Sequence, residues 1–211
     1  MTALLARLSR CTRAGSAAEF ALVLPLLLIF IFGTIDVGRF MWEVNQAEKA
    51  TQVGARMAIV TDPVSSGLVE SDFVGGTLLP GELIPASALG QVKCTSASCV
   101  CSGTCPSMAT TVDSAAFNAI VTRMAQIKPG ITGSNVEILY RGSGFGYAGT
   151  AATGPGGGSA PPETMEISPL VTVALTGVQF QPITSLLLAT IPLPSFTTTM
   201  TAEDLAGQYS N

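Results

Sequence analysis

Apolar residues dominate the stretch from Glu19 to Val60, within which two helical patterns follow each other. Its first part, Phe20 to Ile35, contains no charged residue. At about 1.5 Å of rise per residue this run covers roughly 24 Å, and an extension from Ser16 to Val37 reaches the roughly 30 Å of a bilayer's hydrocarbon core. Three arginines precede the run, namely Arg7, Arg10 and Arg13. The pattern predicts a transmembrane segment over residues 16–37 with a basic cytoplasmic flank, residues 1–15.

The helical pattern continues past the predicted span, over residues 38–62. Polar side chains recur on one stripe and small apolar ones gather on the opposite side. The polar stripe consists of Asn45, Lys49, Gln52 and Arg56, and the apolar side of Ala47, Ala50, Gly54, Met57 and Ala58. Small residues permit the close approach of a sheet or another helix, and Pro63 ends the helix because the residue before a proline is pushed out of the helical region. We therefore expect one helix to join the membrane segment to a domain outside the membrane.

Three residues do not fit a plain apolar helix. Pro25 removes a backbone donor inside the apolar run, which predicts a kink or local melting there. Asp36 is close enough to the end of the run to reach the membrane interface, whereas Glu19 lies where a carboxylate is costly. Glu19 is therefore expected to have a partner or a functional role.

The remainder of the chain, residues 63–211, alternates turn-rich and periodic segments. Val64 to Val92 is rich in turn formers and predicts loops with at most a short strand. Thr111 to Lys128 predicts a helix capped by Asp113 or Thr111. Its buried face is expected to consist of Phe117, Ile120, Val121, Met124 and Ile127.

Three strands are predicted after this helix. They cover Asn135 to Arg141, the regular part of Met165 to Val178 at Leu170 to Thr176, and Ser195 to Thr201, with a short apolar helix at Thr184 to Leu188. The Gly-rich segment Gly142 to Pro162 carries too little apolar surface to order itself and predicts a mobile loop. The fold class is α+β, with a long N-terminal helix and a small antiparallel sheet packed on helices.

Four cysteines cluster within residues 94–105, which we predict to be a loop: Cys94, Cys99, Cys101 and Cys105. The basic flank places the N-terminus in the cytoplasm, so that this cluster lies in the periplasm, where disulfides persist. A bridge between Cys99 and Cys101 has poor geometry, which leaves Cys94–Cys99 with Cys101–Cys105, or Cys94–Cys101 with Cys99–Cys105. A zinc site is the alternative, although the spacing lacks paired C-x-x-C motifs. Two disulfides are the leading interpretation.

Composition and charge argue against catalysis and nucleic-acid binding. The chain has 211 residues, of which 11% are charged, a net charge of −4 and no histidine, which removes the commonest general base and metal ligand. The remaining carboxylate pairs, Glu203 with Asp204 and Glu163 with Glu166, are expected to be solvated. We predict no catalytic residues, no metal site and no cofactor, and no basic surface for nucleic acid.

Residues from Arg13 to Arg39 resemble the signature of a known family. The strings R-A-G-S-A-A-E-F-A-L-V-L-P-L-L-L and F-G-T-I-D-V-G-R-F resemble the N-terminal signature of TadE-like proteins, the minor pseudopilins of the tight-adherence (Flp-type) pilus. The resemblance is specific from Arg13 to about Val60, and Pro194 to Leu205 is similar to the family's closing strand. It implies a pilin-like fold, in which the sheet lies against the emergent half of the first helix.

The resemblance also implies processing by a prepilin peptidase on the cytoplasmic side of the inner membrane. The family pattern has a glycine, four residues, then Glu and an aromatic residue, here Glu19 and Phe20, but only three residues separate Gly15 from Glu19. The cut therefore follows Ala14, which restores the spacing, or follows Gly15, before Ser16. Glu19 would then neutralise the new terminal amine as subunits assemble. The implied partners are the peptidase, a sibling minor pilin, the major pilin and the inner-membrane assembly platform.

Other interpretations of the N-terminus remain. A cleaved secretory signal would end in an A-x-A site, which is not found after the apolar run. A plain, unprocessed anchor for a periplasmic binding or scaffold domain needs only the apolar run and the arginines. An anchored enzyme is the third rival, but the chain lacks a nucleophile motif such as G-x-S-x-G. Removal of the leader would leave 7 basic and 14 acidic residues, a net charge of −7.

Overall fold

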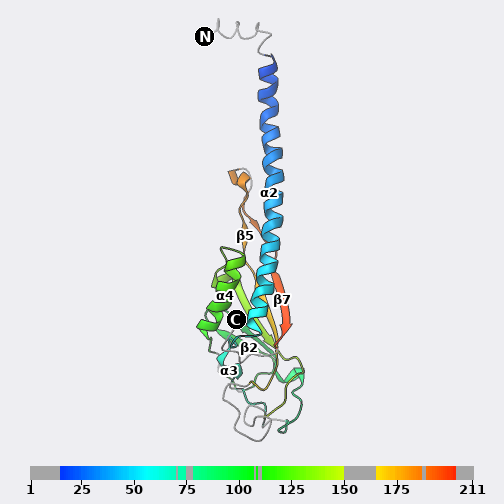
Figure 1. Cartoon of the computed structure of the whole chain (residues 1–211), viewed down its shortest axis with the longest axis vertical. Coiled ribbons are helices and arrows are strands. Elements are labelled where there is room, and N and C mark those ends of the chain that lie inside the picture. Colours follow the sequence, from blue (N-terminus) through cyan, green and yellow to red (C-terminus); the bar gives the residue numbers. More distant parts are fainter. Residues whose placement is uncertain are drawn as a thin grey trace. The chain divides into compact units, whose positions relative to one another are not determined.

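A computed structural model describes residues 15–69, 71–74, 78–106, 108, 111–149, 165–186 and 189–202. Figure 1 shows its helices and strands, coloured along the sequence. The chain divides into two compact units. Unit 1 comprises Met1–Glu43 and Gln179–Ile191, and unit 2 comprises Val44–Val178 and Pro192–Asn211. The fold is α+β, as predicted, with a long N-terminal apolar helix and a small antiparallel sheet domain.

Helix α2, Gly15–Ala58, is a single helix of 44 residues. It continues through Pro25 without interruption, so the local melting predicted at this proline does not occur. A proline removes one donor from the helical ladder, and the bonds on either side suffice to hold the helix together. The helix ends at Ala58 in a turn, in which Val60 and Thr61 both donate to the carbonyl oxygen of Met57.

Unit 2 is built on a five-stranded antiparallel sheet of order β2-β1-β3-β4-β7. The strands are β1 (Gln91–Cys94), β2 (Cys99–Ser102), β3 (Val136–Arg141), β4 (Leu170–Leu175) and β7 (Phe196–Thr201). The last three confirm the three predicted strands. The prediction of a loop around the cysteines was wrong, because β1 and β2 form a hairpin there. Four-residue strands carry too little alternation to be recognised in a sequence.

Strand register places the apolar side chains on one face of the sheet. Val92, Tyr140 and Val171 are lateral neighbours, as are Cys94, Ile138 and Val173, and all six are buried. The other face carries the ion pair between Lys93 and Glu137, whose Nζ and Oε1 atoms lie 2.8 Å apart, and the 2.7 Å hydrogen bond between the hydroxyls of Thr172 and Thr199. One face is therefore packed and the other is mostly polar.

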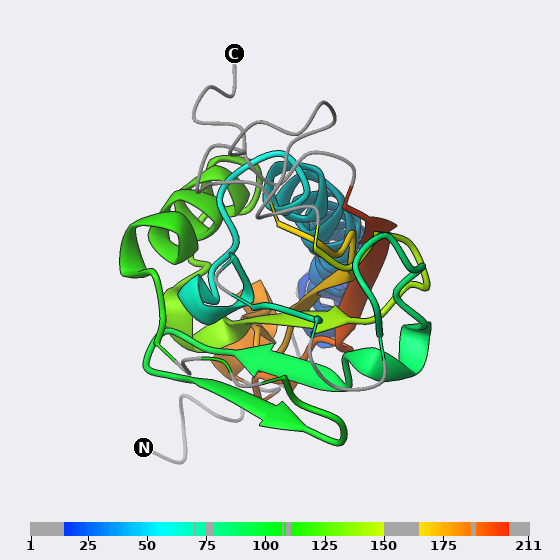
Figure 2. The same cartoon turned by 90° about the horizontal axis from the view of Figure 1, so that it is seen from below.

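Two helices cover the packed face (Figure 2). One is the second half of α2, where the two predicted stripes are confirmed by buried Ala47, Ala50, Gly54 and Ala58 and by exposed Asn45, Lys49, Gln52 and Arg56. Met57, which was also predicted for the apolar side, is half-buried. The other is α4 (Ser114–Ile127), where Asp113 caps the helix by accepting from the backbone N–H groups of Ala115 and Ala116. Phe117, Ile120 and Met124 of α4 are buried as predicted, whereas Val121 and Ile127 are half-buried.

Buried polar contacts tie the loops of unit 2 to this core. The Tyr140 hydroxyl accepts a 2.9 Å hydrogen bond from the backbone N–H of Val64, and burial raises the pKa of this phenol. Glu166 is 4% exposed and accepts from the backbone N–H groups of Phe73 and Gly149 at 3.0 and 2.9 Å. The prediction that Glu166 is solvated was therefore wrong. A buried carboxylate is stable when backbone donors satisfy it, and those donors are remote in sequence. Glu163, Glu203 and Asp204 lie outside the described residues.

The predicted mobile loop is ordered over its first part. Residues 142–149 form bridges from Tyr147 to Leu83 and from Gly146 to Ile167. Gly146 has a φ of 123° and lies so close to the backbone of Glu166 that an added Cβ would be 2.3 Å from the Glu166 carbonyl oxygen. This backbone pairing, which needs few apolar side chains, orders a segment that composition alone predicted to be mobile. Residues 150–164 lie outside the described part of the chain.

Short elements complete the fold. They are α3 (Ser66–Val69), η2 (Ala86–Ala88), η3 (Gly133–Asn135), β5 (Gln179–Phe180), η4 (Ile183–Leu186) and β6 (Ile191–Pro192). Strands β5 and β6 pair in a separate two-stranded sheet. The predicted helix at Thr184–Leu188 is thus found as a shorter 3-10 turn that begins one residue earlier, and Leu187 and Leu188 lie outside the described residues.

Candidate functional site

The N-terminal part of α2 presents an apolar surface on all sides. Its large side chains are exposed within unit 1, among them Phe20 (63%), Leu26 (70%) and Phe30 (69%). Exposed apolar residues that surround a helix are typical of a segment that lies in lipid or among other helices. By length and composition α2 is able to cross a membrane.

The residues predicted for processing and assembly lie at the start of this helix. Gly15 and Ser16 are in its first turn, and Ala14 lies outside the described residues. Glu19 and Phe20 are exposed. Within the part of the chain that the structure describes, the side chain of Glu19 makes no hydrogen bond or ion pair, so its role stays a prediction.

Asp36, at the other end of the apolar run, has a complete set of partners. Its Oδ1 accepts from the backbone N–H of Ile183 at 2.7 Å, and its Oδ2 accepts from the backbone N–H and the hydroxyl of Thr184 at 2.9 and 2.7 Å. Arg39, one turn further along the helix, lies 3.4 Å from Oδ1. Asp36 is only 7% exposed. Three hydrogen bonds from Ile183 and Thr184 and a fourth, longer one from the Arg39 cation compensate the burial of this carboxylate.

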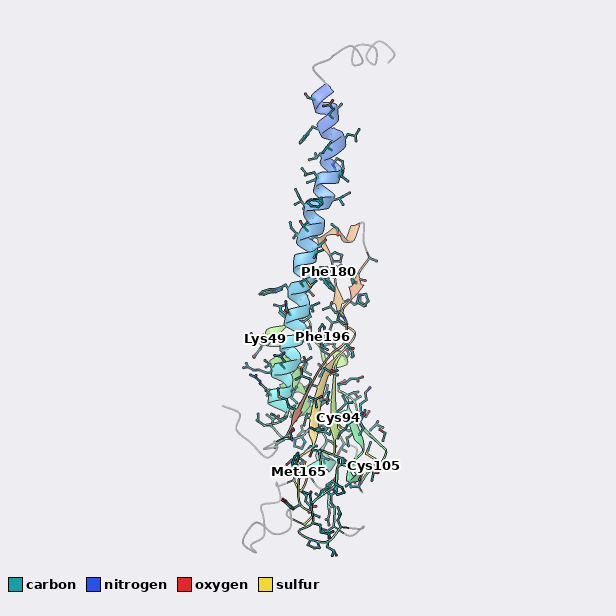
Figure 3. All side chains as sticks on the ribbon, turned by 90° about the vertical axis from the view of Figure 1, so that its right-hand side faces the viewer. Lys49, Cys94, Cys105, Met165, Phe180 and Phe196 are labelled. Carbon is teal, nitrogen blue, oxygen red and sulfur yellow. A yellow bond between two sulfur atoms is a disulfide. The ribbon has the colours of Figure 1, made fainter. Side chains whose placement is uncertain are left out.

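Aromatic and backbone contacts extend this junction, which we call the Asp36 junction. The ring of Phe40 meets the ring of Phe180 edge to face, with centroids 5.5 Å apart, and the Arg39 guanidinium also lies 5.5 Å from the Phe180 centroid. Figure 3 shows Phe180 beside α2. The junction therefore holds residues 179–184 against α2 within unit 1.

Sequence reasoning treated Asp36 as an interfacial residue and did not find this junction. Three of the four donors to Asp36 belong to residues that are 147 and 148 positions away in the chain, and two of these three are backbone groups. The only signal in the sequence is a carboxylate next to an uncharged apolar run.

Two disulfides lie on and beside the β1–β2 hairpin. Cys94 is joined to Cys99, its direct cross-strand neighbour, and Cys101 is joined to Cys105 (Figure 3). This is the first of the two pairings that the spacing left open. The Cys94–Cys99 bridge is buried, whereas Cys105 is exposed. Over the described residues, no group of three or more His, Cys, Asp or Glu side chains is placed to hold a metal ion.

These features define a class, a protein with one N-terminal helix of membrane-spanning length and a disulfide-bonded α+β domain. The family model described as TadE-like protein matches residues 15–56. This match confirms the resemblance predicted from the N-terminal signature, and it covers almost the whole of α2. Comparison with curated proteins and with solved structures gave no match.

Proposed function

We propose that this protein is a minor pilin or pseudopilin that supports assembly of a tight-adherence (Flp) type IV pilus, which serves surface attachment. The observation that carries the proposal is the family match over residues 15–56, which indicates a protein associated with Tad pili. The matched segment is the helix whose apolar side chains are exposed along its first half. The role is structural, not enzymatic.

In this proposal a prepilin peptidase removes the leader after Ala14 or Gly15, and α2 becomes the N-terminus of the mature protein. Its exposed apolar surface supports lateral packing with the helices of a sibling minor pilin and the major pilin at the assembly platform. Lipid tails are as apolar as leucine, so such packing depends on close contacts and on paired polar groups. The protein resides in the inner membrane with unit 2 in the periplasm, where the two disulfides are stable.

Glu19 is the residue proposed to pair with a terminal amine created by processing, its own or that of a neighbour. Its exposure leaves the carboxylate available for a partner subunit. Removal of one member of a buried ion pair leaves an uncompensated charge, which costs about 3–5 kcal/mol in proteins. Glu19→Ala is therefore expected to insert into the membrane normally but to enter pili poorly.

The test is to express the full chain in cells that contain the peptidase and the pilus machinery, and to determine the mass of the protein recovered from membranes. Loss of the leader through Ala14 or Gly15 is expected. Pilus recovery should fall for Glu19→Ala and remain at the wild-type level for Glu48→Ala, which removes another exposed carboxylate of α2. Mature protein that still carries Met1 to Arg13, together with normal pili in the Glu19→Ala strain, would show an unprocessed anchor for a periplasmic scaffold domain instead.

A further inference from the structure

We propose that residues 179–186 and 189–191 form a second membrane-contacting element, whose isoleucines enter the lipid surface beside α2. This inference rests on the proposed membrane anchoring of α2. Its partner is the interface between the lipid headgroups and the acyl chains. The proposal follows from three observations on unit 1, namely the position of the Asp36 junction, the charge pattern of the segment and the exposure of its apolar side chains.

The Asp36 junction fixes the segment at the end of the apolar run of α2. Ile35 is the last residue of the uncharged stretch, and Asp36 follows it directly. The carboxylate of Asp36 binds the backbone N–H groups of both Ile183 and Thr184. Because Asp36 and residues 179–191 belong to the same unit, an α2 helix that spans the bilayer brings this segment to the membrane boundary.

The segment has the composition of an element that contacts lipid. From Ile167 to Ala202 the chain contains no Asp, Glu, Lys or Arg. Ile183 and Ile191 are 53% and 41% exposed, although most isoleucines are buried. Ile183, whose backbone N–H is bound by Asp36, lies at the end of the exposed apolar surface of α2. Contact with lipid is therefore more favourable for these isoleucine side chains than contact with water.

The polar groups at the junction are also arranged for a low-dielectric boundary. Backbone donors that enter the membrane interface need partners inside the protein, and Asp36 supplies them for Ile183 and Thr184. On α2 itself the residues after Asp36 are typical of a membrane boundary, with the half-exposed Arg39 side chain and with Trp42, which is 66% exposed. Anchors of this kind hold an apolar element in the headgroup region.

Tryptophan fluorescence of the full chain in phosphatidylcholine and phosphatidylglycerol vesicles tests the proposal, because Trp42 is the only tryptophan. Lipids with a spin label near the headgroup quench indoles that lie at that depth. The wild-type protein reports on the part of α2 that follows its apolar run. The I183W, W42F double variant reports on the segment, and the V100W, W42F double variant is the control on β2, where Val100 is 60% exposed.

We expect short-wavelength emission and loss of fluorescence for the I183W, W42F protein, and neither for the V100W, W42F protein. Addition of Asp36→Ala should weaken the quenching of the I183W, W42F protein by releasing the segment. Long-wavelength, unquenched emission of the I183W, W42F protein would overturn the proposal, as would equal quenching of the β2 control or no effect of Asp36→Ala.

The experiment separates this inference from the proposed function. Quenching of wild-type Trp42 without quenching of the I183W, W42F protein would leave the anchor in place and disprove contact of the segment with lipid. Short-wavelength emission without quenching would mean that protein, such as a second copy of this chain, covers the segment, which also disproves it. Failure of wild-type Trp42 to respond would disprove the membrane anchor as well.

Discussion

Asp36 and Glu19 show how differently two carboxylates near the ends of one apolar run are used. Asp36 is buried and saturated by donors from a remote segment, whereas Glu19 is exposed. The cost of burying a charge explains the first arrangement, because a carboxylate is retained at such a site only where donors compensate it. The second arrangement leaves a charge available for an intermolecular partner.

At Gly54, α2 lies directly against the core of unit 2. A Cβ added there would lie 2.7 Å from the Met124 sulfur and 2.8 Å from its Cγ. Met124 is fully buried and has little room to move. Glycine therefore sets how closely α2 approaches α4 and β4.

Gly54→Leu should destabilise unit 2 by about 1–3 kcal/mol, since overpacked cores lose this much. The measurement is the urea midpoint of the detergent-solubilised full chain, followed by hydrogen exchange at β3 and β4 amides. Gly38→Leu is the matched control, because a Cβ at Gly38 meets no atom within 4 Å. Equal midpoints for the two variants would contradict this account of the contact.

At the scale of elements, the sequence predicted those helices and strands that are long enough to show a hydrophobic period. The alternation of Val136, Ile138 and Tyr140 was sufficient for β3, and Asp113 marked the start of α4. The β1–β2 hairpin was missed because only four residues form each strand and the cysteines were interpreted as loop residues. The Asp36 junction and the buried Glu166 were missed because their donors are backbone groups brought together only by the fold.

The two disulfides should differ in their contribution to stability. Each closes a short loop, which predicts about 2 kcal/mol from chain entropy. The buried Cys94–Cys99 bridge also fills the core below the sheet edge, whereas the Cys101–Cys105 bridge is more exposed. The C94A, C99A double variant should therefore have a lower urea midpoint than the C101A, C105A double variant under non-reducing conditions. Equal urea midpoints, or a lower midpoint for the C101A, C105A variant, would show that burial of the Cys94–Cys99 bridge does not determine its contribution to stability.

For the whole molecule, the family match and the exposed apolar half of α2 support the same role, that of a membrane-anchored pilus component. The sequence was sufficient for this conclusion because the signature is local and continuous. The family match ends at residue 56, so it says nothing of the function of the sheet domain.

Charges placed within the apolar half of α2 should prevent stable insertion. Leu26 and Ile29 are 70% and 53% exposed, and an arginine near the centre of a transmembrane helix costs about 3 kcal/mol. The L26R, I29R protein should become extractable with alkaline carbonate, whereas wild type and Gln52→Arg, on the exposed polar stripe, remain in the membrane pellet. Retention of the double variant in the pellet would mean that contacts other than this half of the helix hold the protein there.

The length of α2 also determines how a water-soluble form of unit 2 can be prepared. The second half of the helix belongs to the core of unit 2, because four of its alanines are at most 1% exposed, namely Ala47, Ala50, Ala55 and Ala58. A chain shortened to begin near Val44 lacks the apolar first half of α2 and keeps the buried second half. A chain shortened to begin after Ala58 would leave Met124 and Val173 facing solvent, and it would be a poor candidate for crystallisation.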